Sequence, residues 1–470
     1  MIKRSTSTAL AVAALLAGCS FIPTYERPAA PIPSGYPATT ATSEQTTAAT
    51  VPWQDYFAEP RLRQLIEAAL ANNRDLRVAA LNIEQTRAAF QVRRSDRYPG
   101  VGLAANASRA PSTTTGDLTN SFNAGLAIAA WEIDFFGRIA SLQEQALAQY
   151  LATTEGRNAV QVSLVAAVAN GWLNLLADEE LLDLSRRTLA SREESVRLTQ
   201  MRLEAGVVSE LDFRQAQSLT QAARATLAQQ QRQRTLDENA LALLLGQPLP
   251  EHIRASLVGS RLADAPVMAP LPAGLPSALL IHRPDIRQAE QQLIAANAHI
   301  GAARAAFFPR ISLTAQAGTA SGELSGLFKN GSWGFSIAPS LLMPLFDAGR
   351  NQANLESSQA GRSIAVAQYE KSIQTAFREV SDALAGQATL KEQAQAQQSQ
   401  AEAEAARLQL SDLRYRNGVS SYLDLLDAQR SLFAAQQALV QVRLAQLQNQ
   451  VTLYKALGGG ATQTADQASL

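Results

Sequence analysis

Apolar and polar residues alternate in four short stretches of the chain, and this period of two predicts β-strands. The alternating stretches lie at residues 101–108, 122–129, 311–318 and 333–338. Each pair of stretches is separated by a loop, so we expect two hairpins whose strands of about ten residues are long enough to cross a bilayer at a tilt. A soluble hairpin with one wet face is the alternative.

Two other regions favour long helices. No proline occurs from Arg138 to Leu245 or from Phe346 to Leu457, and each region holds few glycines. At about 1.5 Å per residue, the part of the first region before its break would be a helix on the order of 100 Å long, and the returning helix would be roughly half that. A sevenfold spacing of Leu425, Leu432 and Leu439 predicts a coiled-coil seam. We expect these helices to be too polar to span a membrane, which leaves that task to the strands.

The chain repeats one stretch. The segment Arg202–Asp212 recurs 212 residues later as Arg414–Asp424, and each copy contains one glycine, Gly206 or Gly418. A single glycine between two helical segments predicts the tip of a helical hairpin. Because further correspondences surround these copies, we expect two structural repeats.

The expected domain boundaries follow from these patterns, with Pro339 expected to mark a strand irregularity or the membrane boundary. The first repeat spans 53–256, with a β-hairpin at about 98–133 and a helical hairpin at about 138–245. A connection covers 257–275. The second repeat spans 276–458, with a β-hairpin at about 308–345 and a helical hairpin at about 350–457. Before them come a signal peptide (1–18) and an extended tether (19–52), and after them a disordered tail (459–470).

The single cysteine, Cys19, ends a leader that has a basic start and a short apolar core. The run Leu16-Ala17-Gly18-Cys19 resembles a bacterial lipobox, in which the cysteine becomes an acylated, palmitate-bearing N-terminus. Ser20 in the following position resembles sorting to the outer membrane. With Cys19 acylated, no thiol remains for a disulfide.

Charge and candidate chemistry exclude several function classes. The 41 basic residues balance the 41 acidic ones, so nothing indicates nucleic-acid binding. The three histidines lie far apart without acidic or cysteine partners at ligand spacing, so we expect no metal site and no cofactor. No catalytic triad, phosphate-binding loop or carboxylate pair is recognisable, and we expect the protein not to be an enzyme.

Four strands cannot close a barrel, and open strand edges in lipid leave backbone groups unpaired at several kcal/mol each. Closure takes at least about eight strands, so several chains must combine. The predicted fold class is therefore a mixed membrane α/β protein, an oligomeric β-barrel continued by a helical coiled-coil barrel.

Several long motifs carry a family resemblance. They include the two tips, Leu425–Phe433, Gly301–Pro309, Trp131–Arg138 and Leu453–Gly460. Together they resemble the TolC-like outer membrane factors, and the lipidated OprM-like branch most closely. The resemblance implies a homotrimer with a twelve-stranded barrel in the outer membrane of a Gram-negative bacterium and a helical tunnel in the periplasm. It also implies a periplasmic adaptor and an inner-membrane drug/proton antiporter of the RND type as partners.

The two tips differ in ways that suggest a gate. Asp427 and Arg430 have Gln215 and Ser218 as counterparts, and both share one helix face with Leu423. In a trimer this face would give apolar, acidic and basic rings, whereas the alternative is a solvated i,i+3 ion pair. The resemblance implies constriction by these three residues and gate positions at Asp424 and Tyr415.

Residues present in both tips are expected to serve hairpin geometry and adaptor contact. They are Gly206, Val207, Ser209 and Asp212 in the first tip, and Gly418, Val419, Ser421 and Asp424 in the second. Ser209 with Asp212, and Ser421 with Asp424, have the spacing of capping boxes.

We therefore expect the outer membrane channel of a tripartite multidrug efflux pump. It would be a passive exit duct for small amphipathic compounds, opened when adaptor binding untwists the hairpins. The alternatives are a duct for type I protein secretion and a non-conducting structural lipoprotein that spans the periplasm.

Overall fold

The computed structural model describes residues 20–36, 51–113, 116–262, 268, 271 and 276–460. The expected signal peptide, Cys19, much of the tether and connection, and residues 461–470 of the tail lie outside these residues. The chain forms two compact units, which are described separately. The first comprises residues up to Ala30, Leu81–Thr154 and Gln288–Lys371, and the second comprises Pro31–Ala80, Glu155–Arg287 and Ser372 onward.

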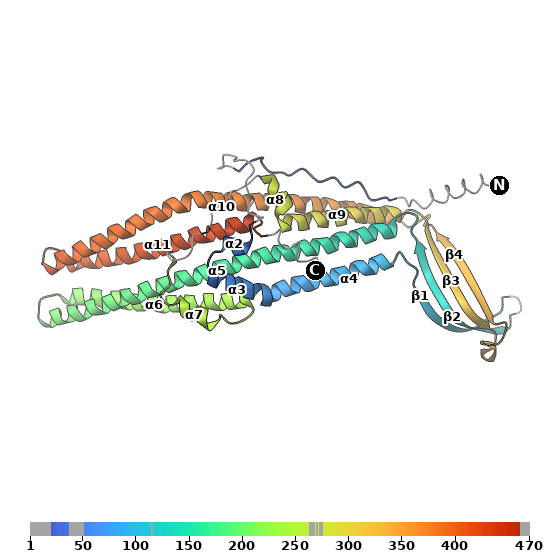
Figure 1. Ribbon diagram of the computed structural model, residues 1–470, viewed down its shortest axis with the longest axis horizontal. Coiled ribbons are helices and arrows are strands. Elements are labelled where there is room, and N and C mark those ends of the chain that lie inside the picture. The colour runs from blue at the N-terminus through green and yellow to red at the C-terminus, as the bar shows by residue number, and fades with distance from the viewer. Residues whose placement is uncertain are drawn as a thin grey trace. The chain divides into compact units, whose positions relative to one another are not determined.

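The order of elements repeats once along the chain (Figure 1). The first half holds α2 (Trp53–Tyr56), α3 (Pro60–Asn72), α4 (Arg74–Ser95), β1 (Val101–Pro111), β2 (Leu118–Ile133), α5 (Arg138–Glu204), α6 (Glu210–Leu245) and α7 (Glu251–Leu257). The second half holds α8 (Pro276–His282), α9 (Pro284–Ala305), β3 (Arg310–Ser321), the 3₁₀ turn η3 (Leu324–Gly326), β4 (Trp333–Leu342), α10 (Arg350–Arg416) and α11 (Tyr422–Ala456).

The first unit contains one antiparallel sheet in the order β1-β2-β3-β4, which confirms the four predicted strands. The strand register places the apolar positions of neighbouring strands opposite one another, and likewise the polar positions. Leu103 lies opposite Leu126, and Gln316 lies opposite Ser336. Asn123 accepts hydrogen bonds from both Asn106 (3.2 Å) and Gln316 (3.3 Å) across the strands. One face of the sheet is therefore mostly apolar, with polar side chains toward one end (Arg109, Asn120, Thr319 and Ser321), and the other face carries mainly small and polar side chains.

Pro339 does not disturb the sheet, so the expected strand irregularity is not there, whereas the alternative that Pro339 marks the membrane boundary stays a prediction. It pairs in register with Leu313, and the β3–β4 ladder runs without a shift. Ala320 donates to the carbonyl of Ser332 (2.8 Å), so the antiparallel alternation makes the pair at Pro339 a non-hydrogen-bonded one. The N–H that proline lacks would therefore point away from β3. The irregularity lies instead in β2 at Ala130, whose φ is 47°.

Both predicted helical hairpins are present, α5 with α6 and α10 with α11 (Figure 1). The outgoing helices α5 and α10 each have 67 residues, and the returning helices have 36 and 35. At about 1.5 Å per residue, the outgoing helices are about 100 Å long. The matching helix lengths show that the sequence repeat is also a structural repeat.

The long helix α5 is more apolar than expected, since we expected all the long helices to be too polar to span a membrane. Part of α5 reaches a mean hydropathy of 1.5 over 18 residues, so by length and composition alone it could pass for a membrane span. The apolar residues from Leu164 to Leu181 belong instead to a buried cluster shared with α3, α6 and α7. Trp172 at its centre is fully buried and donates from Nε1 to Glu59 (2.7 Å). Half of this apolar window is buried, and core packing accounts for that half.

In the first unit, the N-terminal segment lies along α9. Phe21 stacks on Phe308 with ring centroids 4.6 Å apart, and the carbonyl of Pro23 accepts from Asn297 (2.7 Å). Arg27 forms a two-point ion pair with Glu290, at 2.7 and 2.8 Å. This segment, residues 20–27, is hereafter called the strap.

Candidate functional site: the tips of the helical hairpins

Each hairpin tip turns through one left-handed glycine. Gly206 has φ 70° and Gly418 has φ 71°. At the first tip the amide of Val207 donates to the carbonyl of Arg202 (2.8 Å), and at the second tip Val419 donates to Arg414 (2.9 Å). This is the Schellman arrangement, in which glycine accepts a backbone conformation that side chains disfavour.

A capping box starts each returning helix. The Ser209 hydroxyl accepts from the amide of Asp212, and the Asp212 carboxylate accepts from the amide of Ser209. Ser421 and Asp424 make the same reciprocal pair at the start of α11. Asp424 thus already has a local role, because its Oδ2 also accepts from the Ser421 hydroxyl (2.9 Å).

Asp427 is held between two arginines near the second tip. Arg407 of α10 forms an ion pair with its Oδ2, and Arg430 lies 3.5 Å from its Oδ1. The i,i+3 pair with Arg430 is the longer of the two, so the main partner of Asp427 comes from the opposite helix of the hairpin. This contact joins α10 to α11.

Tyr415 joins the two hairpins. Arg202 of α5 donates from Nη1 to the Tyr415 hydroxyl (2.8 Å), and its guanidinium carbon lies 5.2 Å from the centre of the same ring. The Tyr422 ring lies 5.3 Å from that of Tyr415 and belongs to a small apolar cluster with Leu425, Leu426 and Ala216. The α5–α6 hairpin therefore contacts the α10–α11 hairpin directly above the tips.

Apolar side chains are exposed at the outermost turns. Val207 is 73% exposed, Val419 is 66% exposed and Leu423 is 53% exposed. A cavity of about 630 Å³ lies just above, lined by Arg202, Tyr415 and Tyr422 among others. Exposed apolar residues beside a hollow are typical of surfaces that contact other proteins.

Sequence reasoning missed Arg202 and Arg407. Arg407 was accessible to the comparison of repeats that singled out Asp427, because its counterpart is Ser195. Arg202 was not, because arginine stands at the matching position 414 as well. The asymmetry there lies in Tyr415, whose counterpart is Leu203.

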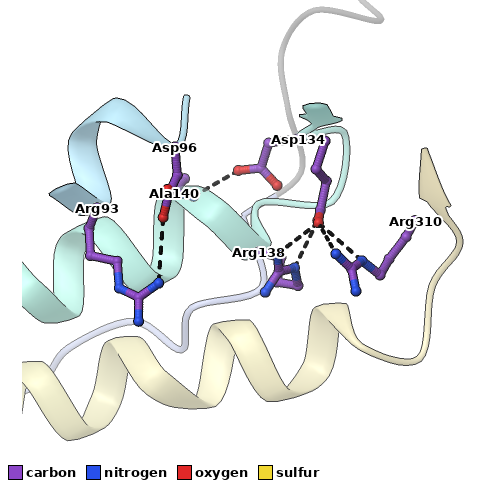
Figure 2. A network of polar contacts seen from close by, with 7 residues as sticks. Arg93, Asp96, Asp134, Arg138, Ala140 and Arg310 are labelled. Atoms are coloured by element: carbon purple, nitrogen blue, oxygen red, sulfur yellow. Dashed lines mark hydrogen bonds and ion pairs between the residues drawn. The ribbon is translucent and has the colours of Figure 1, made fainter. Parts of the chain in front are cut away.

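A second polar cluster lies where the strands meet the helices (Figure 2). Glu132 at the end of β2 accepts from Arg138 at 2.7 Å through both oxygens, and from Arg310 of β3 at 2.7 and 3.0 Å. Asp134 accepts from the amide of Ala140 in the first turn of α5 (2.7 Å). These contacts fix the direction in which α5 leaves the sheet.

Within the described ranges, no group of three or more His, Cys, Asp or Glu side chains is arranged to hold a metal ion. At the tips, Asp427 pairs with Arg407 and Arg430, and the carboxylates of Asp212 and Asp424 belong to the helix caps.

A sheet with one apolar face and open edges, followed by long paired helices, defines a class of protein: an outer membrane channel. The outer membrane efflux protein family model matches residues 65–247 and again residues 275–459. The chain belongs to this family. One matched segment lies in each of the two halves in which the order of elements repeats.

Known relatives and solved structures of similar proteins are also outer membrane channels or efflux proteins. A toluene efflux pump outer membrane protein of Pseudomonas putida, TtgC, is 46% identical over 98% of this chain and 96% of its own length. Outer membrane protein OprJ of Pseudomonas aeruginosa is 42% identical over 96% of this chain and 95% of its own. The open state of the Neisseria gonorrhoeae MtrE outer membrane channel has a TM-score of 0.85 and 41% identity, and covers 94% of this chain and 99% of its own.

The predicted fold class and function are therefore confirmed. The protein is an outer membrane efflux channel in which four strands from each of three chains form a β-barrel that helices continue. It acts as the outer membrane duct of a tripartite efflux system rather than as an enzyme.

Proposed function

We propose that this channel is the passive exit duct for small amphipathic compounds such as aromatic solvents and antibiotics. Relatives of nearly equal length are named toluene, solvent and antibiotic efflux pump outer membrane proteins. Small and polar side chains on one face of the sheet leave a wide wet lumen in a closed barrel. Type I protein secretion remains the alternative, and none of these relatives is named for it.

The gate that we propose consists of two contacts near the tips. Asp427 with Arg407 locks α10 to α11, and Arg202 with Tyr415 locks one hairpin to the other. Breaking both would let the hairpins move apart. Leu423 and Arg430 share a helix face with Asp427, and in a trimer they would add an apolar and a basic ring. Asp424 would contribute mainly through its cap.

The partners that we propose are a periplasmic adaptor and an RND-type antiporter of the inner membrane. The adaptor would contact the exposed Val207 and Val419 and the turns that carry them. Because the turn glycines and the caps hold these valines in position, Ser209, Asp212 and Ser421 support the same surface. Energy for transport would come from the antiporter.

Acylation of Cys19 would anchor the chain in the outer membrane. The strap supports this proposal, since Phe21 stacks on Phe308, two residues before β3. The acylated residue would thus enter lipid close to the strands.

A deletion strain tests the function. Loss of the gene should raise susceptibility to toluene and to amphipathic antibiotics, and the wild-type channel should restore resistance. An unchanged drug profile together with loss of a secreted protein would favour the secretion alternative.

A further inference from the structure

Arg192 of α5 is a buried cation that no carboxylate among the described residues neutralises. Its side chain lies among buried residues with 7% exposure. Nη1 donates to the carbonyl of Leu219 (3.0 Å), and the Phe433 ring centre lies 5.7 Å from the guanidinium carbon. The buried Nε has no hydrogen-bond partner, and no described carboxylate forms an ion pair with this guanidinium.

Burying an unpaired guanidinium such as that of Arg192 costs free energy. An arginine stays protonated, so burial does not neutralise it, and a buried charge needs an opposite charge or several acceptors. Burial, reinforced by the positive charge of Arg430, lowers the pKa of Arg192. A carbonyl and an aromatic face satisfy only part of a guanidinium with five N–H groups. The remaining donors require an acceptor.

A cavity of about 180 Å³ adjoins this guanidinium. It lies between α5 on one side and α10 and α11 on the other. Polar side chains that can donate hydrogen bonds line it, and no carboxylate does. They are Arg187, Thr188, Ser191, Gln429 and Gln436. Since a water molecule takes about 30 Å³ of liquid volume, the cavity has room for a phosphate ion or a carboxylate group.

We propose that this cavity is an oxyanion-binding site, in which Arg192 binds the phosphate or carboxylate group of a small molecule between the two helical hairpins. The guanidinium supplies the charge and the free Nε donor. The hydroxyl of Ser191 and the amide of Gln429 supply further donors from opposite hairpins.

An anion bound here would hold α5 to α11. Gln429 lies between Asp427 and Arg430 in sequence, so occupancy would also favour the closed tips. This second consequence rests on the gate proposed above, whereas binding itself does not.

Isothermal titration calorimetry on the full detergent-solubilised trimer tests the binding. Inorganic phosphate and acetate are titrated separately, with chloride at matched ionic strength as the blank. The wild type should bind at least one of them saturably, and the responding anion identifies the group. Arg192→Gln should weaken binding at least about tenfold, because a charged hydrogen-bond partner is lost.

Arg197→Gln is the matched control. Arg197 lies on the same helix, is exposed and pairs with Glu194, so this variant should bind like the wild type. Arg192→Gln should still assemble, because it removes an unneutralised buried charge. If it does not fold, Arg192→Lys keeps the charge without the planar fork and should weaken binding instead.

Two results would overturn the proposal. One is the absence of saturable binding of either anion to the wild type; if Arg192→Gln then dissociates the trimer, a neighbouring subunit neutralises the arginine instead. The other is binding that stays unchanged in Arg192→Gln, or in Arg192→Lys where Arg192→Gln does not fold.

Discussion

Asp427 connects the two helices of one hairpin through a contact that the other hairpin lacks. Its ion pair with Arg407 crosses from α11 to α10, and the matching positions in the first hairpin hold Gln215 and Ser195. The ion pair is half-exposed, so it adds little to folding stability. It can still decide between closed and open tips, because a trimer contains three copies.

Replacing Asp427 by asparagine should open the proposed gate. The variant keeps the size of the side chain and loses the attraction to Arg407. Single-channel conductance in planar bilayers should rise at least several-fold. Asp382→Asn breaks an exposed i,i+4 contact elsewhere on α10 and should leave conductance unchanged. Equal conductance in Asp427→Asn and the wild type would count against the gate.

Asp178 should make stability depend on pH. Burial, together with the neighbouring Asp237 carboxyl, raises the pKa of Asp178 from 3.8 to about 7. Between these two pH values the folded protein holds a proton that the unfolded chain has released, so stability falls as pH rises from about 4 to 7 and then levels off.

Thermal unfolding of the trimer at several pH values between 5 and 8 checks this dependence. In Asp178→Asn the thermal stability should fall less as pH rises, and at pH 8 this variant should be more stable than the wild type. Asp183→Asn changes a more exposed carboxylate five residues along α5 and should preserve the wild-type slope. A wild type whose stability rises from pH 5 to 7, with no difference in slope from Asp178→Asn, would contradict the assignment.

At the scale of elements, the packing of the strap on α9 depends on Gly301, where the missing side chain leaves a notch for Ile22. A Cβ at Gly301 would lie 2.6 Å from Ile22 Cγ1 and 2.6 Å from Ser141 Oγ. Because neither atom can approach so closely, the strap must leave or α9 must shift. Glycine therefore fits this position better than alanine does, although alanine favours a helix by about 1 kcal/mol.

Gly301→Ala should release the strap. Chymotrypsin should then cleave after Tyr25 several-fold faster, as read by mass spectrometry of timed digests. Gly361→Ala on α10 is the control, because a Cβ there meets nothing within 4 Å. It should leave cleavage unchanged and gain the ordinary helix preference. Equal digestion of all three proteins would mean that the strap does not need the notch.

Much of this architecture was predictable, because it depends on local period and on repetition. The alternation at Phe335 and Ile337, the Pro-free runs and the two glycines determined strands, helices and tips. The exceptions depend on what lies across from a residue. Pro339 fits because of its pairing with Leu313, and the partner of Asp427 lies 20 residues away on another helix. The periodicity of apolar and polar residues along the sequence predicts neither of these two contacts.

At the scale of the whole molecule, closure of the barrel sets the roles of the two sheet faces. β1 and β4 are the outer strands of one chain's sheet, so each must pair with another chain for the backbone to be satisfied in lipid. The apolar face then contacts lipid and the polar face lines the lumen. Neighbouring residues of β4 on opposite faces should therefore respond in opposite ways to the same substitution.

Ser336 and Ile337 provide that comparison, since Ser336 lies opposite Gln316 on the polar face and Ile337 lies opposite Ala315 on the apolar face. Ile337→Lys places a charge in lipid at a cost of about 2–4 kcal/mol per chain near the midplane, and three copies should abolish the trimer, as read on unheated gels. Ser336→Lys places the same charge in water, so the trimer should form and its bilayer current should shift toward anions. If both variants assemble with unchanged ion preference, or if Ser336→Lys is the one that fails, then the two faces do not play these roles and the lumen must lie elsewhere.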